Sequence, residues 1–589
     1  MAAILSEVLV ERLAEWGVDT VYGLPGDGIN GIMEGLRRHA DKVRFVLVHH
    51  EEAAALMACA HAKSTGQLGV CVATSGPGGI HLANGLYDAK LDHAPVLAIT
   101  GMPETAVLGT GYQQEVHLDK LFTDVAVYNE VVANPVQLPG LVDIAVRTAY
   151  ARRGVAHLTI PNDVQVAEAG ADPWPHVAPA NPPRTAPRYL APPVRPRRID
   201  LEPAADLLNA GGKVGILVGI GALGAGRLVE RFADTVAAPV VKTLPGKMVV
   251  PDDSPYVIGG IGLLGTAPAE DLMEDIDVLV MLGTNYPYTK YLPDPGTVAV
   301  IQVDIDPARL GNRIPVDVPL VGDVEATLAA LLPMLQARKD LEHLHRYQAK
   351  MREWRAKLRA LETPERDPVA PQYLAAVLDE LAAEDAVLTC DSGTVATWAA
   401  RHWEIRGGRE FYLSGNLATM ACGVPYAIAI QRAYPDRQVL ALVGDGGFAM
   451  LMAEFHTAVW HGLPVKVIIS NNNGLGMILW EQMVLGFPEF GVRFGTPLPD
   501  YAAWARAAGG YGIHVATATE LPDAIRTALR EDGPALVDVA VDPNEPPLPG
   551  KVSYEQAVKF AQAFLRGQPH KAAIATTLFK DRIQQLRAS

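Results

Sequence analysis

The chain has 589 residues, of which 49% are apolar and 20% are charged. At roughly 100–200 residues per domain this length predicts three or four domains, and the composition excludes a disordered or fibrous chain. Lys and Arg number 50 against 66 Asp and Glu, which gives a formal charge of −16. An acidic chain is a poor candidate for wrapping nucleic acid, because neutralising phosphates requires a basic face.

The cysteines and the N-terminus predict a cytoplasmic protein. Glu7 and Glu11 stand where a signal peptide would carry a basic region, and no uninterrupted apolar run approaches the roughly 18 residues of a membrane-spanning helix. The cysteines occur singly in apolar segments and form no CxxC pair, which predicts reduced core thiols. They are Cys59, Cys71, Cys390 and Cys422.

The first segment alternates between helical and strand patterns. Residues 3–16 have helical spacing and stop at Gly17, and residues 51–63 are Ala-rich without Gly or Pro. Short apolar strands are expected at 21–24, 43–48 and 69–73. Such alternation predicts a parallel sheet with helices on both faces.

Proline-rich stretches divide the rest of the chain. Residues 172–198 predict a linker, after which the strand–helix alternation restarts at Gly212 and runs to about residue 335. A charged helical stretch (336–362) and prolines between 364 and 371 precede a third α/β block. The predicted fold is α/β, with three doubly wound parallel-sheet domains and a helical tail. The predicted ranges are 1–180, 195–337, 365–548 and, for the tail, 549–589.

The third block carries the most informative motif. A buried strand at 439–443 ends in Gly444, Asp445, Gly446 and Gly447, and a predicted helix (449–461) and strand (465–470) lead to Asn471 and Asn472. Both polar positions follow strands, and open α/β sheets bind ligands at that edge. Asp445, the Asn472 amide and the Gly474 backbone carbonyl offer the hard oxygen ligands that Mg²⁺ prefers, and the glycines let backbone N–H groups approach a diphosphate.

This motif resembles the thiamin diphosphate (ThDP) fingerprint. Over nearly its whole length the chain is similar to ThDP enzymes, most closely to pyruvate oxidases and quinone-reducing pyruvate dehydrogenases. The resemblance implies a pyrimidine-binding, a central FAD-binding and a diphosphate-binding domain, in that order. Its matching stretches are 22–27, 50–54, 75–82, 84–88, 283–288 and 304–308. Further cofactor contacts implied by it are Pro25, Gly26, Ser75, Ser392 and Gly393.

Glu51 follows a predicted strand and opens the Ala-rich helix. By resemblance it is the buried acid that activates the ThDP pyrimidine, since burial raises a carboxyl pKa and lets it share a proton at neutral pH. Glu52 better fits an acid that stabilises the helix N-terminus. The resemblance also places Met420 under the bend of the cofactor and the Ala418 carbonyl at its 4′-amino group, although Met420 could equally be a core residue.

Three polar residues are expected to face substrate by resemblance: His81, Gln114 and Glu481. Gln113 replaces a Phe of the family pattern. The size of the substrate, and the tendency of the enzyme to join two oxo acids, therefore stay open. Acetolactate synthases usually carry Trp where this chain has Glu481, so the glutamate favours oxidative decarboxylation. Trp480 is adjacent, so it stays open whether Glu481 or Trp480 stands at the position of the acetolactate synthase Trp.

The middle block has Gly219 and Gly221 in a G-x-G-x-x-G pattern after a strand at 214–218. An ordinary NAD site expects an acidic residue about 20 positions later, where Lys242 stands instead. The resemblance to flavin-binding pyruvate oxidases therefore fits better. Along the ribityl chain and flavin it places Gly283, Thr284, Asn285 and Tyr286. At the adenosine end it places Asp304, Asp323 and Val324.

The tail has an apolar helical face of Ile574, Leu578, Ile583 and Leu586 with basic residues nearby. In quinone-reducing relatives a C-terminal helix meets the membrane, which implies at most weak peripheral contact at its inner face. The alternative is a helix docked on its own subunit.

The resemblance implies oxidative decarboxylation of pyruvate or a similar 2-oxo acid through a ThDP enamine. Electrons pass to FAD and then to quinone or oxygen, and acetate or acetyl phosphate is released. It also implies Mg²⁺ and a homo-oligomer in which Glu51 of one subunit meets Asp445 and Asn472 of another, with a dimer as the minimal unit and a tetramer expected. The alternatives are an acetolactate synthase-like carboligase and a non-catalytic protein of the same fold.

Overall fold

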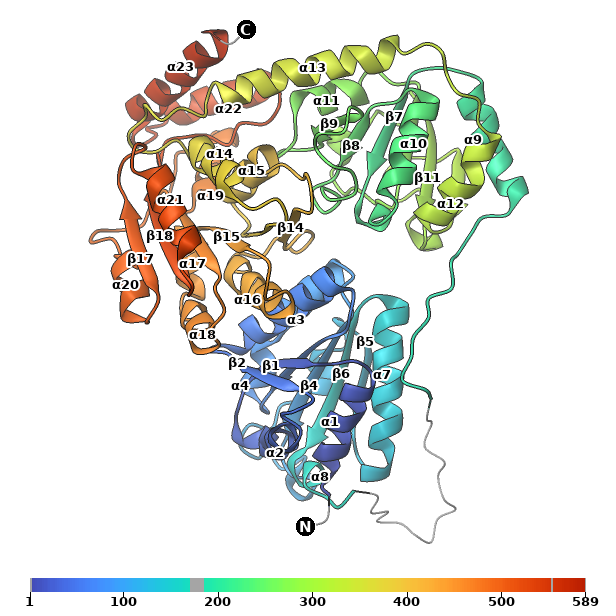
Figure 1. The fold of residues 1–589 in the computed structure, drawn as a ribbon, viewed down its shortest axis with the longest axis vertical. Helices are drawn as coiled ribbons and strands as arrows, with labels where there is room; N and C mark the ends of the chain where they lie inside the picture. The colour runs from blue at the N-terminus through green and yellow to red at the C-terminus, as the bar shows by residue number, and fades with distance from the viewer. Residues whose placement is uncertain (1–2, 170–184, 552–553, 588–589) are drawn as a thin grey trace.

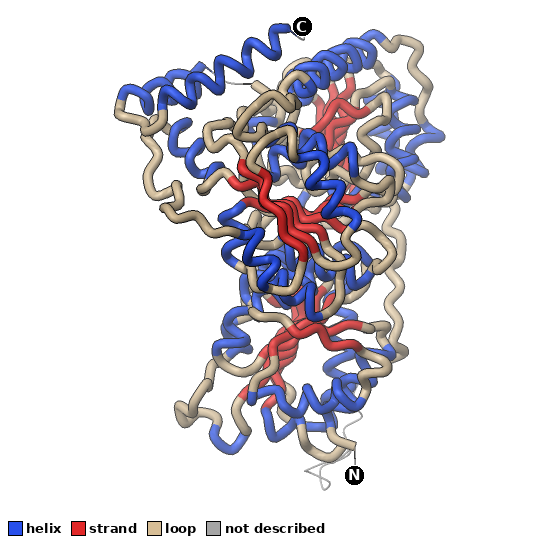
Figure 2. Tube along the Cα trace, turned by 60° about the vertical axis from the view of Figure 1, so that its left-hand side comes forward, coloured by secondary structure: helices blue, strands red, loops and turns tan. Residues whose placement is uncertain are grey.

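The computed structural model describes residues 3–169, 185–551 and 554–587, which form three parallel sheets of six strands each. Helices lie on either side of the sheets, so the predicted α/β fold is confirmed (Figure 1; Figure 2). All four cysteines are free and buried, as predicted. None of the helices in the described ranges combines the length and hydropathy of a membrane span.

The first domain has the strand order β2-β1-β3-β4-β6-β5. Its helix α3 (Glu51–Thr65) is almost entirely buried, because its small Ala side chains let it pack against both its own domain and helix α16 (Gly423–Ala433) of the third domain (Figure 1). The strands are β1 (Thr20–Leu24), β2 (Arg44–Leu47), β3 (Gly69–Ala73), β4 (Val96–Met102), β5 (Ala126–Val131) and β6 (Val155–Pro161). The other helices are α1 (Leu5–Glu15), α2 (Asn30–Arg38), α4 (Pro77–His81), α5 (Ala83–Leu91), α6 (Leu118–Leu121), α7 (Leu138–Arg152) and α8 (Asn162–Gln165).

The middle domain has the order β9-β8-β7-β10-β11-β12, which is the 3-2-1-4-5-6 order of dinucleotide-binding sheets. The strands are β7 (Val214–Val218), β8 (Val240–Lys242), β9 (Val257–Gly260), β10 (Val278–Leu282), β11 (Ala299–Asp304) and β12 (Val318–Val321). The helices are α9 (Arg198–Asn209), α10 (Gly226–Val236), α11 (Ala267–Met273) and α12 (Val324–Leu331). Helix α13 (Glu342–Arg359) leads into the third domain.

The third domain repeats the topology of the first, with the order β14-β13-β15-β16-β18-β17. The strands are β13 (Val387–Cys390), β14 (Glu410–Leu413), β15 (Val439–Gly444), β16 (Lys466–Asn471), β17 (Tyr511–Val515) and β18 (Ala535–Ala540). The helices are α14 (Pro371–Leu381), α15 (Thr394–His402), α16 (Gly423–Ala433), α17 (Asp445–Met450), α18 (Glu454–Trp460), α19 (Gly476–Val484), α20 (Tyr501–Ala507) and α21 (Leu521–Arg530).

One predicted element of this domain is wrong. The helix expected over 449–461 is two helices, α17 and α18, and the first begins at Asp445. Gly446 and Gly447 therefore lie in the first turn of a helix that begins four residues before the predicted start. The physical reason is that Gly446 and Gly447 have no side chains to collide with the neighbouring segments.

Residues 185–197 contain no helix or strand, and the remainder of the predicted linker, 172–184, lies outside the described residues. The tail forms α22 (Tyr554–Leu565) and α23 (Lys571–Arg587), which lie beside the third domain (Figure 1). Ile574 is buried against α19, and Leu578 packs on the same cluster. The side chain of Leu586 lies outside what the structure describes.

Candidate functional site: two strand-end clusters

The first cluster lies at the carboxyl ends of three neighbouring strands. Pro25 follows β1, Glu51 follows β2 and Ser75 follows β3. Since these strands are adjacent and parallel, their ends meet at one edge of the sheet. The Ser75 hydroxyl donates to Gln114 Oε1 at 3.2 Å, so the structure also brings the predicted Gln114 to this edge. Gly26 packs against Thr74, where a Cβ would lie 2.5 Å from its side chain.

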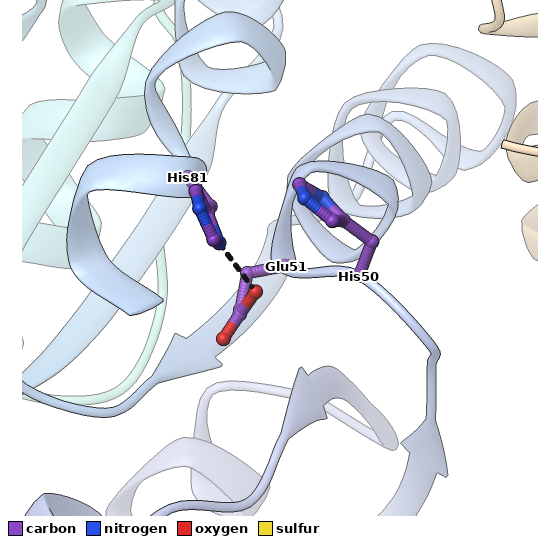
Figure 3. A group of neighbouring side chains, drawn as sticks. All are labelled: His50, Glu51 and His81. Carbon is purple, nitrogen blue, oxygen red and sulfur yellow. Dashed lines mark hydrogen bonds and ion pairs between the residues drawn. The ribbon is translucent and has the colours of Figure 1, made fainter. Parts of the chain in front are cut away.

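Glu51 is the first residue of α3 and is only 6% exposed. His81 Nδ1 lies 2.9 Å from Glu51 Oε2, and the His50 and His81 rings stack at 4.6 Å between centroids (Figure 3). The ligand atoms of these three side chains all lie within 4.8 Å of one another. His81 is therefore placed to orient the carboxylate of Glu51, a role that the sequence alone did not indicate.

Glu52 makes different contacts from Glu51. Its Oε1 accepts from the Asn84 side-chain amide at 2.7 Å, and the same amide donates to Thr419 Oγ1 of the third domain at 2.9 Å. Glu52 thus holds Asn84, which joins the first and third domains. This engagement favours Glu51 as the carboxylate available to a ligand.

The second cluster lies where α15, α17 and α19 begin, at Thr394, Asp445 and Gly476. These helices follow the adjacent strands β13, β15 and β16, and the strand order reverses between β13 and β15. Helix N-termini present free N–H groups and positive dipole ends, so their convergence at a switch point forms a site for a diphosphate. Ser392 and Gly393 immediately precede α15, and Gly393 has a φ of +125° that favours glycine.

Asp445 and Asn472 have the properties that a Mg²⁺ site requires. Asp445 is 2% exposed, and burial raises its pKa to about 7. Its Oδ2 accepts from the Gly474 N–H at 3.1 Å, which places Gly474 beside the carboxylate. Asn472 Oδ1 is buried without a hydrogen-bond partner among the described residues, whereas Asn471 donates to Asp538 at 2.9 Å. The residues fit the ion: a carboxylate and an unpaired amide oxygen are available to it.

Asp391 is a residue of this cluster that we did not predict. It is buried, its Oδ1 accepts from the Gly423 N–H at 2.7 Å, and burial raises its pKa to about 7. A Cβ on Gly447 would lie 2.0 Å from Asp391 Oδ2, so the carboxyl sits directly over the first turn of α17. Its position next to the predicted Ser392 was the one signal in the sequence.

Met420 is half-buried and belongs to none of the hydrophobic clusters among the described residues. The neighbouring Ala418 is exposed and has a φ of +57°, an uncommon conformation for a residue with a side chain. These positions favour an open segment that meets a ligand over the core role that we had left open for Met420.

Helix α19 presents Trp480 and Glu481 to different surroundings. Ile478 is 43% exposed, and Glu481 is exposed on the same face one turn later. Trp480 faces the other way and is buried in a cluster with the tail, with its ring 6.1 Å from that of Phe560. Of these two neighbours on α19, Glu481 is therefore the exposed side chain and Trp480 the buried one.

The middle domain brings its predicted residues to the switch point between β7 and β10. Gly221 donates its N–H to the Gly283 carbonyl at 3.0 Å, and a Cβ on Gly219 would lie 2.5 Å from Thr284. These glycines thus allow two loops to approach each other. Asn285 Oδ1 is buried without a partner among the described residues, which fits a polar ligand.

The other predicted flavin residues have structural contacts as well. Tyr286 is buried in a hydrophobic cluster, Asp323 caps α12 by accepting from Ala326, and Val324 is buried at the start of that helix. Asp304 is buried, which raises its pKa, and its Oδ1 accepts from the Asp306 N–H at 2.9 Å.

Comparisons with known proteins agree with this geometry. Residues 4–121, 201–331 and 391–539 match, respectively, the N-terminal TPP binding domain, the central domain and the C-terminal TPP binding domain of thiamine pyrophosphate enzymes. The fold and the two strand-end clusters thus define a thiamin diphosphate enzyme of three α/β domains.

Three relatives illustrate the similarity. The chain is 43% identical to the thiamine pyrophosphate-containing protein YdaP of Bacillus subtilis over 560 residues, 95% of each chain. It is 35% identical to the pyruvate oxidase of Lactiplantibacillus plantarum over 92% of this chain and 89% of that one. It is 32% identical to the acetolactate synthase large subunit of Corynebacterium glutamicum over 91% and 86%. The chain belongs to the thiamine pyrophosphate enzyme family.

Proposed function

We propose that this protein is an FAD-containing oxidoreductase that decarboxylates pyruvate or a similar 2-oxo acid. When bound, ThDP supplies the carbanion chemistry that allows CO₂ to leave, and FAD accepts two electrons before they reach quinone or oxygen. The product is acetate or acetyl phosphate. The observation that carries the choice of oxidation is the exposed Glu481 on α19, where acetolactate synthases usually present Trp.

The chain's own residues have separate tasks in this proposal. Asp445, Asn472 and the Gly474 carbonyl hold Mg²⁺, and the N-termini of α15 and α17 hold the diphosphate. Glu51 holds a proton at N1′ of the pyrimidine, and His81 keeps the Glu51 carboxyl in place. Gln114 and Glu481 orient the substrate.

The middle domain supports the flavin. Its 3-2-1-4-5-6 strand order, the loops around Gly221 and Gly283 and the unpaired oxygen of Asn285 suit a dinucleotide at the switch point. Lys242 supports a flavin over NAD, because its ammonium is held by Asp252 at 2.5 Å and stands where an NAD site has an acid.

We also propose that a second copy of the chain completes the active site. Among the described residues no hydrogen bond joins the cluster of Glu51, His81 and Gln114 to that of Asp445 and Asn472. Ile80, Met450 and Ile478 expose 45%, 58% and 43% of their surface beside these clusters, and a neighbouring subunit would cover them.

Anaerobic stopped-flow spectroscopy tests the oxidation. The purified protein, supplied with ThDP, Mg²⁺ and FAD, is mixed with a panel of 2-oxo acids while the flavin absorbance is recorded. We expect rapid bleaching with pyruvate or a close analogue, followed by recovery when oxygen or quinone is added. A flavin that stays oxidised while acetolactate accumulates would contradict the proposal and favour the carboligase that the acetolactate synthase relatives represent.

A further inference from the structure

A cavity of about 70 Å³ lies where three parts of the chain meet. Its walls come from β8 and the segments around β9, from the second half of α13, and from the end of α15. A space of this size holds several water molecules, and therefore an anion as large as phosphate. Apart from Lys242, which was used above only to argue against NAD, none of the residues discussed for ThDP, Mg²⁺ or flavin lines it.

The lining carries more positive than negative charge. Four cationic side chains line the cavity, Lys242, Lys247, Arg355 and Arg401, against the carboxylates of Asp252 and Glu404.

The two carboxylates are already engaged. Asp252 accepts from Lys242 at 2.5 Å and from Lys247 at 3.1 Å, and Arg406 holds Glu404 at 2.7 Å. Burial lowers the pKa of Lys242 to about 8, although the neighbouring carboxylate of Asp252 acts to raise it.

Among the described residues, the hydrogen-bond acceptors of Arg355 and Arg401 are backbone carbonyls. Arg355 donates to the Asp252 carbonyl at 2.5 Å, and Arg401 donates to the carbonyls of Leu263 and Leu264 at 3.2 and 3.4 Å. Glu270, whose charge also acts on Arg401, is not part of the lining. Each arginine has further N–H groups that a bound anion would satisfy.

Two indole donors add to this surface. The Nε1 atoms of Trp354 and Trp403 are buried without an acceptor among the described residues, and both residues line the cavity. Trp403 is 1% exposed, and the guanidinium of Arg409 stacks over its ring at 4.7 Å. Because buried N–H groups are nearly always paired, these two indoles are donors that a bound acceptor would satisfy.

We propose that this cavity binds a free tetrahedral oxyanion, inorganic phosphate or its analogue sulfate, between the arginines and the two indoles. The bound ion joins the middle domain, α13 and the third domain, so its binding stabilises their junction.

Calorimetric titration of the protein loaded with ThDP, Mg²⁺ and FAD tests the site, with phosphate exchanged for chloride at constant ionic strength. We expect saturable binding that Trp354→Phe and Arg355→Gln each weaken by about tenfold, since each loses a hydrogen bond to the ion. Arg352→Gln is the matched control, because Arg352 lies on the exposed side of α13 and outside the lining.

Phosphate could also enter the diphosphate site of the coenzyme, and added ThDP separates the two sites. Saturating ThDP and Mg²⁺ should leave phosphate binding at the cavity unchanged, because none of the residues assigned to the coenzyme is part of the lining. Absence of saturable binding would show that the cavity holds only water and would overturn the proposal. Equal affinities in the parent, Trp354→Phe and Arg355→Gln, or tighter binding of acetate than of phosphate, would overturn it as well.

Discussion

Glu454 accepts a hydrogen bond of 3.1 Å from the backbone N–H of His50, the residue that precedes Glu51. The same oxygen accepts from the His49 N–H at 3.1 Å, and the Thr457 hydroxyl donates to the other at 2.7 Å. Glu454 is fully buried at the start of α18, nine residues after Asp445 in the sequence. The third domain thereby positions the loop that carries Glu51.

We first predict a pH dependence of stability that comes from Glu454. Burial raises its pKa from 4.5 to about 7, so the folded protein binds this proton more tightly than the unfolded chain does. Its stabilising contribution is complete below pH 4.5 and is lost as the pH rises towards 7, by about 3 kcal/mol in all. Calorimetric unfolding between pH 4 and 8 should show a smaller decline in the free energy of unfolding for Glu454→Gln than for the parent protein. Glu353→Gln, on the exposed face of α13, serves as the control, and identical slopes in the parent and Glu454→Gln would contradict the assignment.

Replacing Glu51 should separate catalysis from cofactor binding. Glu51→Gln is expected to lower turnover by at least about 100-fold, the usual effect of losing a positioned acid, while Mg²⁺-dependent ThDP binding is retained. Glu52→Gln is the matched control, because Glu52 is engaged with Asn84. Steady-state kinetics and a ThDP titration measure the two effects. Equal losses in both variants would mean that the wrong acid was chosen.

Mixing two inactive variants tests whether the site lies between subunits. Glu51→Gln and Asp445→Asn are each expected to be inactive alone. In a mixed dimer one of the two sites combines both intact residues, so activity should return when the variants are unfolded and refolded together. If each site formed within a single chain, no activity would return.

Asn472→Ala should raise the Mg²⁺ concentration needed for half-maximal ThDP binding by about tenfold, because an oxygen ligand is lost. Asn473→Gly is the control: Asn473 has a φ of +56°, which glycine adopts without strain, and its removal should leave the Mg²⁺ requirement unchanged. Coenzyme binding measured at a series of Mg²⁺ concentrations compares the variants. If Asn473→Gly had the larger effect, Asn473 and not Asn472 would be the Mg²⁺ ligand.

Two neighbouring glycines should respond oppositely to alanine. In Gly447→Ala the new Cβ would lie 2.0 Å from Asp391 Oδ2, so we expect a loss of about 1–3 kcal/mol in stability and weaker ThDP binding. Gly444→Ala should be tolerated, because nothing lies within 4 Å of its Cβ position and its φ of −81° suits alanine. Thermal unfolding measures both, and similar stabilities would contradict the role assigned to Asp391.

Much of the candidate site followed from local sequence. Asp445 and Asn472 each come directly after a short apolar strand, and parallel strands bring such positions to one edge whatever the rest of the fold does. The same reasoning applied to Glu51, whereas Pro25 and Ser75 were expected from the family resemblance. The start of α17 at Asp445 could not be predicted, because it depends on how closely Asp391, Leu475 and Phe494 approach Gly446 and Gly447.

The sequence by itself determined the three α/β domains and the residue types at the strand ends, because hydrophobic periodicity and turn residues act over short distances along the chain. Only the tertiary structure decided which other side chains contact and position these strand-end residues. Glu454 lies 404 positions from His50, and Asp391 lies 56 before Gly447. The cavity between α13 and α15 likewise draws on residues from 242 to 404. No local pattern specifies such partners, since packing between separate elements alone sets their distance and burial.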